Sequence, residues 1–235
     1  TSGPIVVKNW HSQAFDKPMT RTREAVEIIQ LALSGERVDY EGACFRLEGF
    51  RMLIRPIQDR IPIYLATLKT RAVRQTGEIA DGWLPTHVSV RNIAASRAPL
   101  VAGANAAGRD PLEIDMAALT LVACSDDGET ARALCREHLA YYIGGMGTFY
   151  HELMDGYGYG DVADRIQSAW RNGNRAGAAD VIPRDVLDDL VVAGTRAECL
   201  AAIEARREAG ISHLVVFPPH NVSPELFVTT IEAIA

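Results

Sequence analysis

Short runs of uncharged, apolar residues alternate along this chain with longer stretches in which apolar residues recur at helical spacing. Four of the apolar runs read as buried strands, at residues 61–65, 83–86, 116–124 and 213–217. The third contains nine residues without a charge, which indicates burial on both faces. Because strands that alternate with helices build parallel sheets, the pattern predicts an α/β fold with a parallel sheet.

The stretch from residue 61 to residue 86 reads as a complete strand–helix–strand unit. Its first strand leads into a loop of small and hydroxyl residues at 66–70, a helix spans 71–80, and Asp81-Gly82 turns the chain into the second strand. Ligands of such folds lie at the carboxyl ends of the strands. We therefore expect the loop at 66–70 and the strand end near Thr86 and His87 to face one site. The alternative is that this unit is scaffold only.

The remaining elements are predicted from periodicity and from capping residues. A helix is expected over 21–33, a small hairpin within 38–47, a helix over 89–107, and another over 130–142 that Asp126-x-x-Glu129 caps. Gly144 to Gly147 would end that helix as a hinge, opening a helical insertion at about 143–194. A capping box at Thr195-x-x-Glu198 and a cap at Ser223-Pro224 begin the last two helices. No shift in composition marks a boundary, so residues 1–235 are predicted to form a single, partial barrel domain.

Composition and charge narrow the possible functions. The formal charge is −6 and no basic patch stands out, which argues against nucleic-acid binding. No apolar run reaches the roughly 18 residues that a membrane span needs, and residues 1–10 lack the pattern of a secretion signal. The four cysteines are far apart in sequence and are predicted to be free thiols in a reducing compartment, the cytoplasm: Cys44, Cys124, Cys135 and Cys199.

Motifs for several common chemistries are missing from the sequence. No HExxH, paired CxxC or G-x-S-x-G occurs, so metal-dependent hydrolysis and serine hydrolysis have no support, and we predict no metal site. The glycines at 144–147 follow a predicted helix rather than a strand, which is the wrong context for a dinucleotide or P-loop fingerprint.

Several segments together resemble the luciferase-like monooxygenase superfamily, in particular its actinobacterial branch of F420-dependent oxidoreductases. The resemblance rests on GPIVVKNWHSQAFDKPMTRTREAVEIIQLALSGERVDYEGACFRL, IPIYLA with GEIADGWLP, YYIGGMGTFYHELMDGYGY with the segment that follows it, and REAGISHLVVFPP. It implies a TIM-type (β/α)8 barrel. It also implies that the chain begins after the fourth barrel strand, with strands 1–4 missing from it. Such a half-barrel would have open edges, so we expect pairing with another copy, a homodimer.

The resemblance also implies where a cofactor would bind. Family members hold the cofactor phosphate with backbone N–H groups of loops that follow the strands. Two stretches match such loops: Thr1-Ser2-Gly3, and Ala66-Thr67-Leu68-Lys69. Family members commonly carry a Gly-Pro pair near Leu68 and Lys69, which this chain lacks, so Lys69 would offer a point charge instead.

Aromatic and imidazole side chains near the predicted barrel mouth are further candidates. Trp10 offers a plane for the deazaflavin ring, or packs its loop against the hairpin. His11 is the predicted proton donor, and His87, just past a strand, is a predicted cofactor contact. His220 follows the last strand and is either a phosphate contact or a solvated loop residue. The other three histidines, His138, His151 and His213, are interpreted as structural.

The function that follows is an F420-dependent oxidoreductase, in which the deazaflavin carries the hydride chemistry and the protein supplies position and a proton for a small organic substrate. An FMN-dependent monooxygenase of the same superfamily is the alternative within that class. A non-catalytic flavin-binding or structural relative is the alternative from another class.

Overall fold

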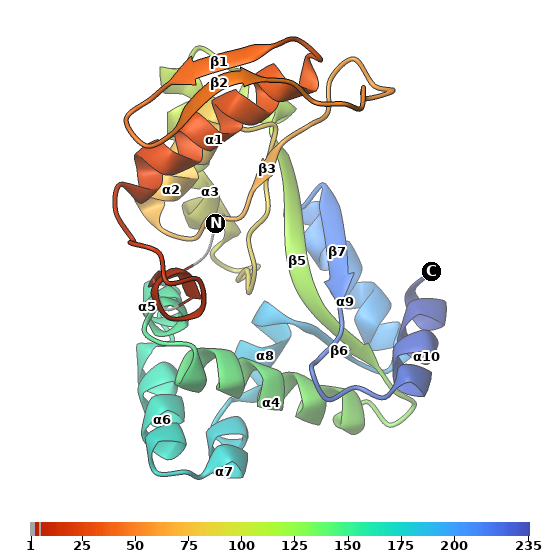
Figure 1. Cartoon of the computed structure of the whole chain (residues 1–235). Helices are drawn as coiled ribbons and strands as arrows, with labels where there is room; N and C mark the ends of the chain where they lie inside the picture. Colours follow the sequence, from red (N-terminus) through yellow and green to blue (C-terminus); the bar gives the residue numbers. More distant parts are fainter. Residues whose placement is uncertain (1–2, 5) are drawn as a thin grey trace. The chain divides into compact units, whose positions relative to one another are not determined.

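The computed structural model describes residues 3–4 and 6–235, and within it the chain divides into two units. The first unit contains residues 1–84 and 97–115, and the second contains residues 85–96 and 116–235. Figure 1 shows the elements of both. Each unit is described in turn.

The first unit begins with a π-helix, η1 (Val6–Trp10), and the helix α1 (Pro18–Leu33), which has its proline in the first turn. An antiparallel hairpin follows, formed by β1 (Val38–Glu41) and β2 (Arg46–Phe50). The buried Glu24 carboxylate of α1 accepts the backbone N–H groups of three of the four residues between the strands, at 2.7 to 2.9 Å: Ala43, Cys44 and Phe45. The predicted helix at 21–33 and the predicted hairpin are therefore confirmed.

The strand–helix–strand unit is present as β3 (Tyr64–Leu65), α2 (Thr70–Ile79) and β4 (Gly82–Trp83), with the two strands parallel. Both strands are shorter than the sequence predicted. The Asp81 carboxylate accepts the backbone N–H of Ile63 at 2.8 Å, and the carbonyl oxygen of Ile63 accepts the N–H of Asp81. These two bonds take the place of further strand pairing at Ile63.

Two glycines allow α2 and α3 (Ile93–Ala106) to come into backbone contact. A Cβ atom added to Gly77 of α2 would lie 2.1 Å from the carbonyl oxygen of Leu100, and one added to Gly103 of α3 would lie 1.9 Å from that of Arg74. The guanidinium of Arg109 also donates a hydrogen bond to the carbonyl oxygen of Gly77, at 3.0 Å. The unit ends with a short 3-10 helix, η2 (Pro111–Glu113).

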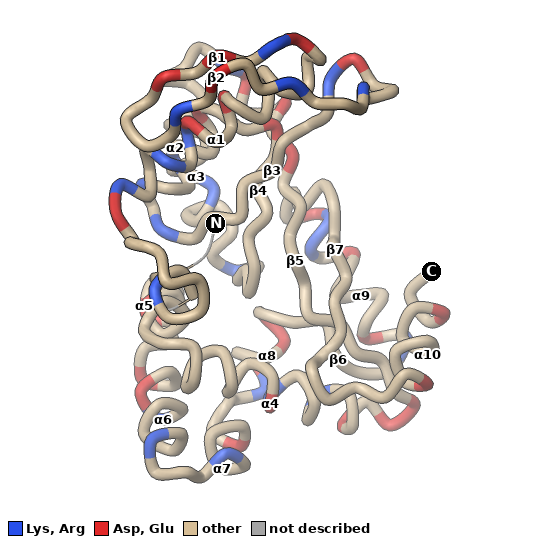
Figure 2. Tube along the Cα trace, viewed as in Figure 1, with Lys and Arg blue, Asp and Glu red and all other residues tan. Residues whose placement is uncertain are grey.

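The second unit is organised around β5 (Asp115–Cys124), whose first residue belongs to the first unit. β7 (His213–Phe217) pairs in parallel with Ala117 to Leu121, and β6 (Val192–Gly194) pairs in parallel with Val122 to Cys124. Thr86 adds an isolated parallel bridge to Leu119. From Met116 to its end, β5 carries no charge, and neither does β6 (Figure 2), as expected for strands covered on both faces.

Helices of the second unit build its core against the sheet. They are α4 (Glu129–Gly145), α5 (Phe149–Gly156), α6 (Gly160–Arg171), α7 (Arg175–Asp180), α8 (Arg184–Leu190), α9 (Arg196–Glu208) and α10 (Pro224–Ile234). The buried apolar residues of α4 to α8 form one cluster with Leu121, which includes Leu139, Ile143, Ile166 and Leu187. Cys199 of α9 lies in a second cluster, with Val122, Cys124 and Val192 of the sheet. Residues 143–194, assigned from sequence to a helical insertion, hold α5 to α8 and then β6, a strand that was not predicted.

Two local details differ from the prediction. Asp127, not Asp126, accepts the N–H of Thr130 at the start of α4, at 3.1 Å. Gly144 and Gly145 lie inside α4 rather than in a hinge, because the Trp170 ring packs where their Cβ atoms would be, at 2.7 and 2.9 Å. The helix ends at Gly145 and is followed by its C-cap residue Met146 and by Gly147, which has a positive φ of 84°.

Other predicted caps are confirmed. Thr195 and Glu198 form a capping box at the start of α9, and Glu198 also accepts a 2.9 Å bond from the buried guanidinium of Arg132. Ser223 accepts the N–H of Leu226 at the start of α10.

The cysteines are free thiols, three of them buried: Cys124, Cys135 and Cys199. A membrane-crossing helix would have to be longer and more apolar than any helix in the described part of the chain.

Candidate active site

Three histidines meet where strands of the second unit end. Thr86 and Val215 both pair in parallel with Leu119 of β5. The segments that contain Thr86 and Val215 therefore run in the same direction as β5, and the residues that follow them lie at the same edge of the sheet. His87 follows Thr86 directly, and His220 lies three residues beyond the end of β7. His138 reaches the same place from the middle of α4. The carboxyl edge of parallel strands is where α/β folds bind their ligands.

His138 is hydrogen-bonded to His220, and its ring lies near that of His87. Its Nδ1 accepts the backbone N–H of His220 at 3.1 Å and lies 3.1 Å from Nδ1 of the His220 ring. The ring centroids of His138 and His87 are 6.3 Å apart. His87 and His138 are buried, and His220 is exposed.

Aromatic rings enclose the two buried imidazoles. Tyr142 stacks on His138 with centroids 4.8 Å apart and an interplanar angle of 12°, and Phe217 meets the same ring edge-on at 5.4 Å. Tyr142 and Tyr150 both meet His87 edge-on, at 5.1 and 5.4 Å. Burial raises the pKa of Tyr150 to about 12, so its hydroxyl keeps its proton at neutral pH.

Burial keeps the two enclosed imidazoles neutral. His87 and His138 are only 3% and 4% exposed. Burial, with a smaller contribution from His138, lowers the pKa of His87 to about 3. Burial, with a smaller contribution from His220, lowers the pKa of His138 to about 4. The Nε2 atoms of both rings are buried without a hydrogen-bond partner, which is unusual because buried polar atoms nearly always have one.

The backbone at His87 is strained. Its φ of 51° lies in the left-handed region, which residues with a Cβ rarely adopt. Such a conformation costs on the order of 1–3 kcal/mol and tends to occur at functional sites. The strain, the burial and the unpartnered Nε2 coincide in one residue, so His87 belongs to the candidate site.

The predicted phosphate loop of the first unit lies at the start of α2. Lys69 is the residue before the first turn of this helix, and Lys69, Thr70 and Arg71 are exposed. The first turn contains no acidic residue, and no side chain caps it. The loop thus presents cationic side chains beside backbone N–H groups that lack helical acceptors, which is the chemistry of an anion site.

The other residues of that loop have different surroundings. Thr67 is buried, its Oγ1 lies 2.8 Å from Oγ1 of Thr76, and its carbonyl oxygen accepts the indole N–H of Trp83 at 2.8 Å. Thr67 therefore shapes the loop from within. Ala66 is exposed and Leu68 is half-buried.

The remaining predicted residues lie at the start of the chain. Trp10 is 66% exposed at the end of η1, and His11 follows it on the surface. The carbonyl oxygen of Gly3 accepts the N–H of Val7 at 3.2 Å. Thr1 and Ser2 lie outside the described residues. The roles predicted for these residues remain predictions.

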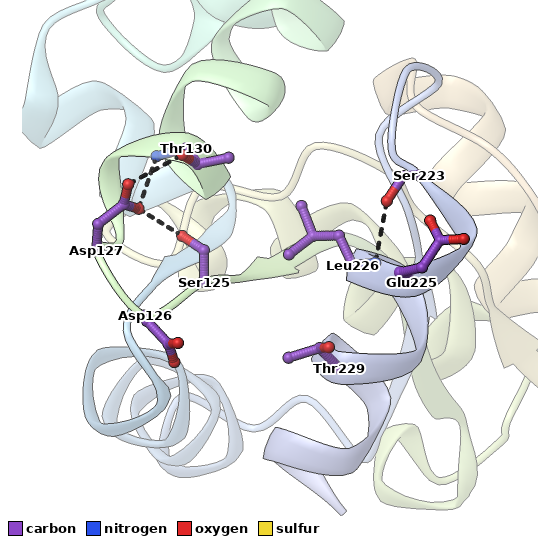
Figure 3. A pocket seen from close by; sticks show the side chains of 8 residues that line it. All are labelled: Ser125, Asp126, Asp127, Thr130, Ser223, Glu225, Leu226 and Thr229. Atoms are coloured by element: carbon purple, nitrogen blue, oxygen red, sulfur yellow. Dashed lines mark hydrogen bonds between the residues drawn. The ribbon is translucent and has the colours of Figure 1, made fainter.

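A polar hollow of ≈ 450 Å³ lies near the carboxyl end of β5 (Figure 3). It is lined by Ser125, Asp126, Asp127, Thr130, Ser223, Glu225, Leu226 and Thr229. The N–H of Thr130 holds the pKa of Asp127 below its usual range, and the backbone N–H of Glu225 does the same for its own carboxyl. An ionised carboxylate repels phosphate, so this hollow does not suit an anionic cofactor. The described residues contain no group of three or more His, Cys, Asp or Glu side chains that could hold a metal ion.

The sequence analysis named His87 and His220 as candidates and interpreted His138 as structural, and these roles remain predictions. The sequence could not show that the three residues lie together, because they meet only when α4 packs beside the strand ends. One sequence feature pointed that way. His138, Tyr141 and Tyr142 lie three and four residues apart, so they share one face of α4.

The family model of luciferase-like monooxygenases matches residues 1–213. Rv3520c of Mycobacterium tuberculosis, named as a coenzyme F420-dependent oxidoreductase, is 30% identical over 233 residues, 92% of this chain and 67% of the relative. The 5,10-methylenetetrahydromethanopterin reductase of Archaeoglobus fulgidus is 24% identical over 210 residues, 87% of this chain and 62% of the relative. The chain thus spans about two thirds of the length of these relatives.

A solved structure also resembles this chain. The coenzyme F420-dependent tetrahydromethanopterin reductase from Methanopyrus kandleri superposes with a TM-score of 0.74 at 25% identity, over 92% of this chain and 60% of that one. The resemblance and the α/β fold predicted from the sequence are both confirmed by these matches.

Proposed function

Since this chain belongs to the luciferase-like monooxygenase family, we propose that it is an F420-dependent oxidoreductase that transfers hydride between the deazaflavin and a small organic substrate. The observation that carries the proposal is the 30% identity with a relative named as F420-dependent, over 92% of this chain. Following the sequence analysis, we further propose that the protein acts in the cytoplasm as a homodimer.

The start of α2 fits the anionic part of such a cofactor. A phosphate at this helix end would accept backbone N–H groups of the first turn and lie beside the cations of Lys69 and Arg71. The absence of an acidic residue from that turn removes the repulsion that a phosphate would meet there. These features support α2 as the phosphate-binding element despite the missing Gly-Pro pair.

The deazaflavin, when bound, supplies the hydride, and the protein supplies the other requirements of the reaction. The neutral imidazoles of His87 and His138 each offer a nitrogen able to hold a proton in a site from which Tyr142, Tyr150 and Phe217 exclude water. This supports the histidine cluster, in addition to His11, as a source of the proton.

The second candidate is an FMN-dependent monooxygenase, because the family is named for luciferase-like monooxygenases. The phosphate of FMN could occupy the same helix end, so the α2 geometry does not separate the two cofactors. The non-catalytic alternative is favoured only by the altered residues at Leu68 and Lys69.

Cofactor titration of the full chain distinguishes these candidates. We expect fluorescence titration to show saturable binding of F420 and at least tenfold weaker binding of FMN. Tight FMN binding without F420 binding would support the monooxygenase, and binding of neither would support the non-catalytic relative.

Reversing the charge of Lys69 tests the phosphate site. We expect Lys69→Glu to weaken F420 binding about tenfold or more, which corresponds to about 1.4 kcal/mol. The fold should survive, because a carboxylate near a helix N-terminus stabilises the helix. Lys17→Glu is the matched control, since Lys17 is an exposed lysine in the same position before α1. Equal weakening in both variants would show that net charge, not the α2 site, governs binding.

A further inference from the structure

We propose that Asp189 is a positioning residue for His87: its hydrogen bonds fix residues 89–91 and so keep His87 in its strained, buried conformation. The role of Asp189 in the reaction rests on the proposed function, whereas its hold on His87 does not. All the residues concerned belong to the second unit, within 85–96 and 116–235.

The Asp189 carboxylate of α8 is buried and accepts three hydrogen bonds. Its Oδ1 accepts the backbone N–H of Arg91 at 2.9 Å. Its Oδ2 accepts the hydroxyl of Ser89 at 2.5 Å and that of Tyr159 at 2.8 Å. The backbone carbonyl oxygen of Asp189 also accepts the N–H of Val90, at 3.4 Å. Three successive residues that follow His87 closely are therefore bonded to one residue of α8.

Ser89 extends this network along the same segment. It is completely buried, and its Oγ accepts the backbone N–H of Asn92 at 3.1 Å and the Nδ2–H of Asn92 at 2.9 Å. A hydroxyl has one hydrogen and two lone pairs, so these two bonds and the one to Asp189 use its full capacity. Buried networks in which every member is satisfied make the structure around them rigid. We therefore expect residues 89–92 to have one arrangement only.

A buried carboxylate needs a cation nearby, and Arg206 of α9 provides one. Arg206 is buried, and its guanidinium donates to the backbone carbonyl oxygens of Asp189 at 3.3 Å and Val191 at 2.8 Å. Burial lowers the pKa of Arg206 to about 10, although the charge of Asp189 opposes this shift. Arg206 thus remains a cation at neutral pH. Its charge compensates the buried carboxylate, as such a group requires.

The sheet holds His87 from the other side. Thr86, directly before it, forms the parallel bridge to Leu119 of β5. Since Asp189 fixes residues 89–91, only His87 and one further residue lie between the two fixed points. A φ of 51° at a residue with a Cβ persists only where the surrounding structure imposes it. Asp189 therefore supplies one of the two constraints that keep His87 in place.

The rate at which diethyl pyrocarbonate acylates His87 in the full chain at pH 7 tests the proposal. The reagent modifies imidazoles that reach solvent, and the buried His87 is reached only when its segment opens. Tryptic peptides report the rate by mass spectrometry, because His87 is the only histidine between Arg74 and Arg91. We expect Ser89→Ala to raise the rate about tenfold or more, since it removes a hydrogen bond to a charged group.

Tyr159→Phe is the matched control, because it removes the other hydroxyl from the same carboxylate oxygen. That hydroxyl bonds to Asp189 and to the side chain of Arg91, not to the residue next but one after His87. Its His87 rate should remain that of the original chain. The exposed His213 should react at the same rate in every variant. Equal acceleration in both variants would show general loosening, and an unchanged rate in folded Ser89→Ala would overturn the proposal.

Asp189→Asn provides the same test if Ser89→Ala does not fold. Asparagine has the size of aspartate, but its amide nitrogen cannot accept the hydroxyl hydrogen bonds that Oδ2 accepts. The His87 rate should rise in this variant too, and an unchanged rate would contradict the role of Asp189. The measurement needs no cofactor, so failure of F420 binding would overturn the proposed function and leave this result standing.

Discussion

Replacing Gly103 by alanine is expected to lower the free energy of unfolding by about 3 kcal/mol, the upper end of what overpacking costs. The added Cβ would lie 1.9 Å from the carbonyl oxygen of Arg74 and 2.8 Å from its carbon. Both atoms belong to the backbone of α2, which cannot rotate away as a side chain could. The two helices would have to separate, and contacts along their whole interface would be lost.

A loss of stability in Gly103→Ala would distinguish overpacking between the helices from the effect of helix propensity. Alanine favours an exposed helix over glycine by about 1 kcal/mol, so helix propensity alone predicts stabilisation. Gly156→Ala is the matched control, because Gly156 also lies in a helix but has open space where its Cβ would be. Urea unfolding followed by circular dichroism should show a loss for Gly103→Ala and a gain of up to about 1 kcal/mol for Gly156→Ala. A neutral Gly103→Ala would contradict the close approach of α2 and α3.

Lowering the pH from 7 to 5 is expected to destabilise the protein by about 2 kcal/mol for each of the two buried histidines. Their pKa values are about 3 for His87 and about 4 for His138 in the folded chain, against an ordinary value of 6.5. Between these limits the unfolded chain binds more protons than the folded one. Stability is therefore fully present above pH 6.5 and falls as the pH decreases toward 4.

The pH range from 7 to 5 distinguishes the effect of the histidines on stability from that of a carboxylate such as Glu198. Glu198 has a pKa of about 2, lowered chiefly by the backbone N–H of Thr195, so its contribution is lost only below pH 4.5. Urea unfolding at pH 7, 6 and 5 should show that His138→Gln loses about half of the pH dependence, and that His213→Gln keeps all of it. An unchanged slope in His138→Gln would mean that His138 is not held neutral by burial.

Local sequence was sufficient for much of the fold. The capping box at Thr195 and Glu198, the hairpin after α1 and the strands β5 and β7 were predicted correctly, because each depends on residues close together in the chain. β6 was missed, since three residues cannot show a period and this strand exists only by pairing with Val122 to Cys124. The pair Gly144 and Gly145 was interpreted as a hinge, because nothing nearby in sequence indicates that Trp170 packs against it.

Some features of the candidate site also depend on neighbouring residues, and others depend on tertiary packing. The amino-acid sequence by itself determined the family resemblance, the expected cofactor and the cationic start of α2, which depend on neighbouring residues. Only the tertiary structure decided that His87, His138 and His220 lie together, and that the backbone N–H of His220 bonds to Nδ1 of His138. These residues lie far apart in the chain. Their hydrogen bonds and burial, and hence their protonation, arise only when α4 packs beside the strand ends.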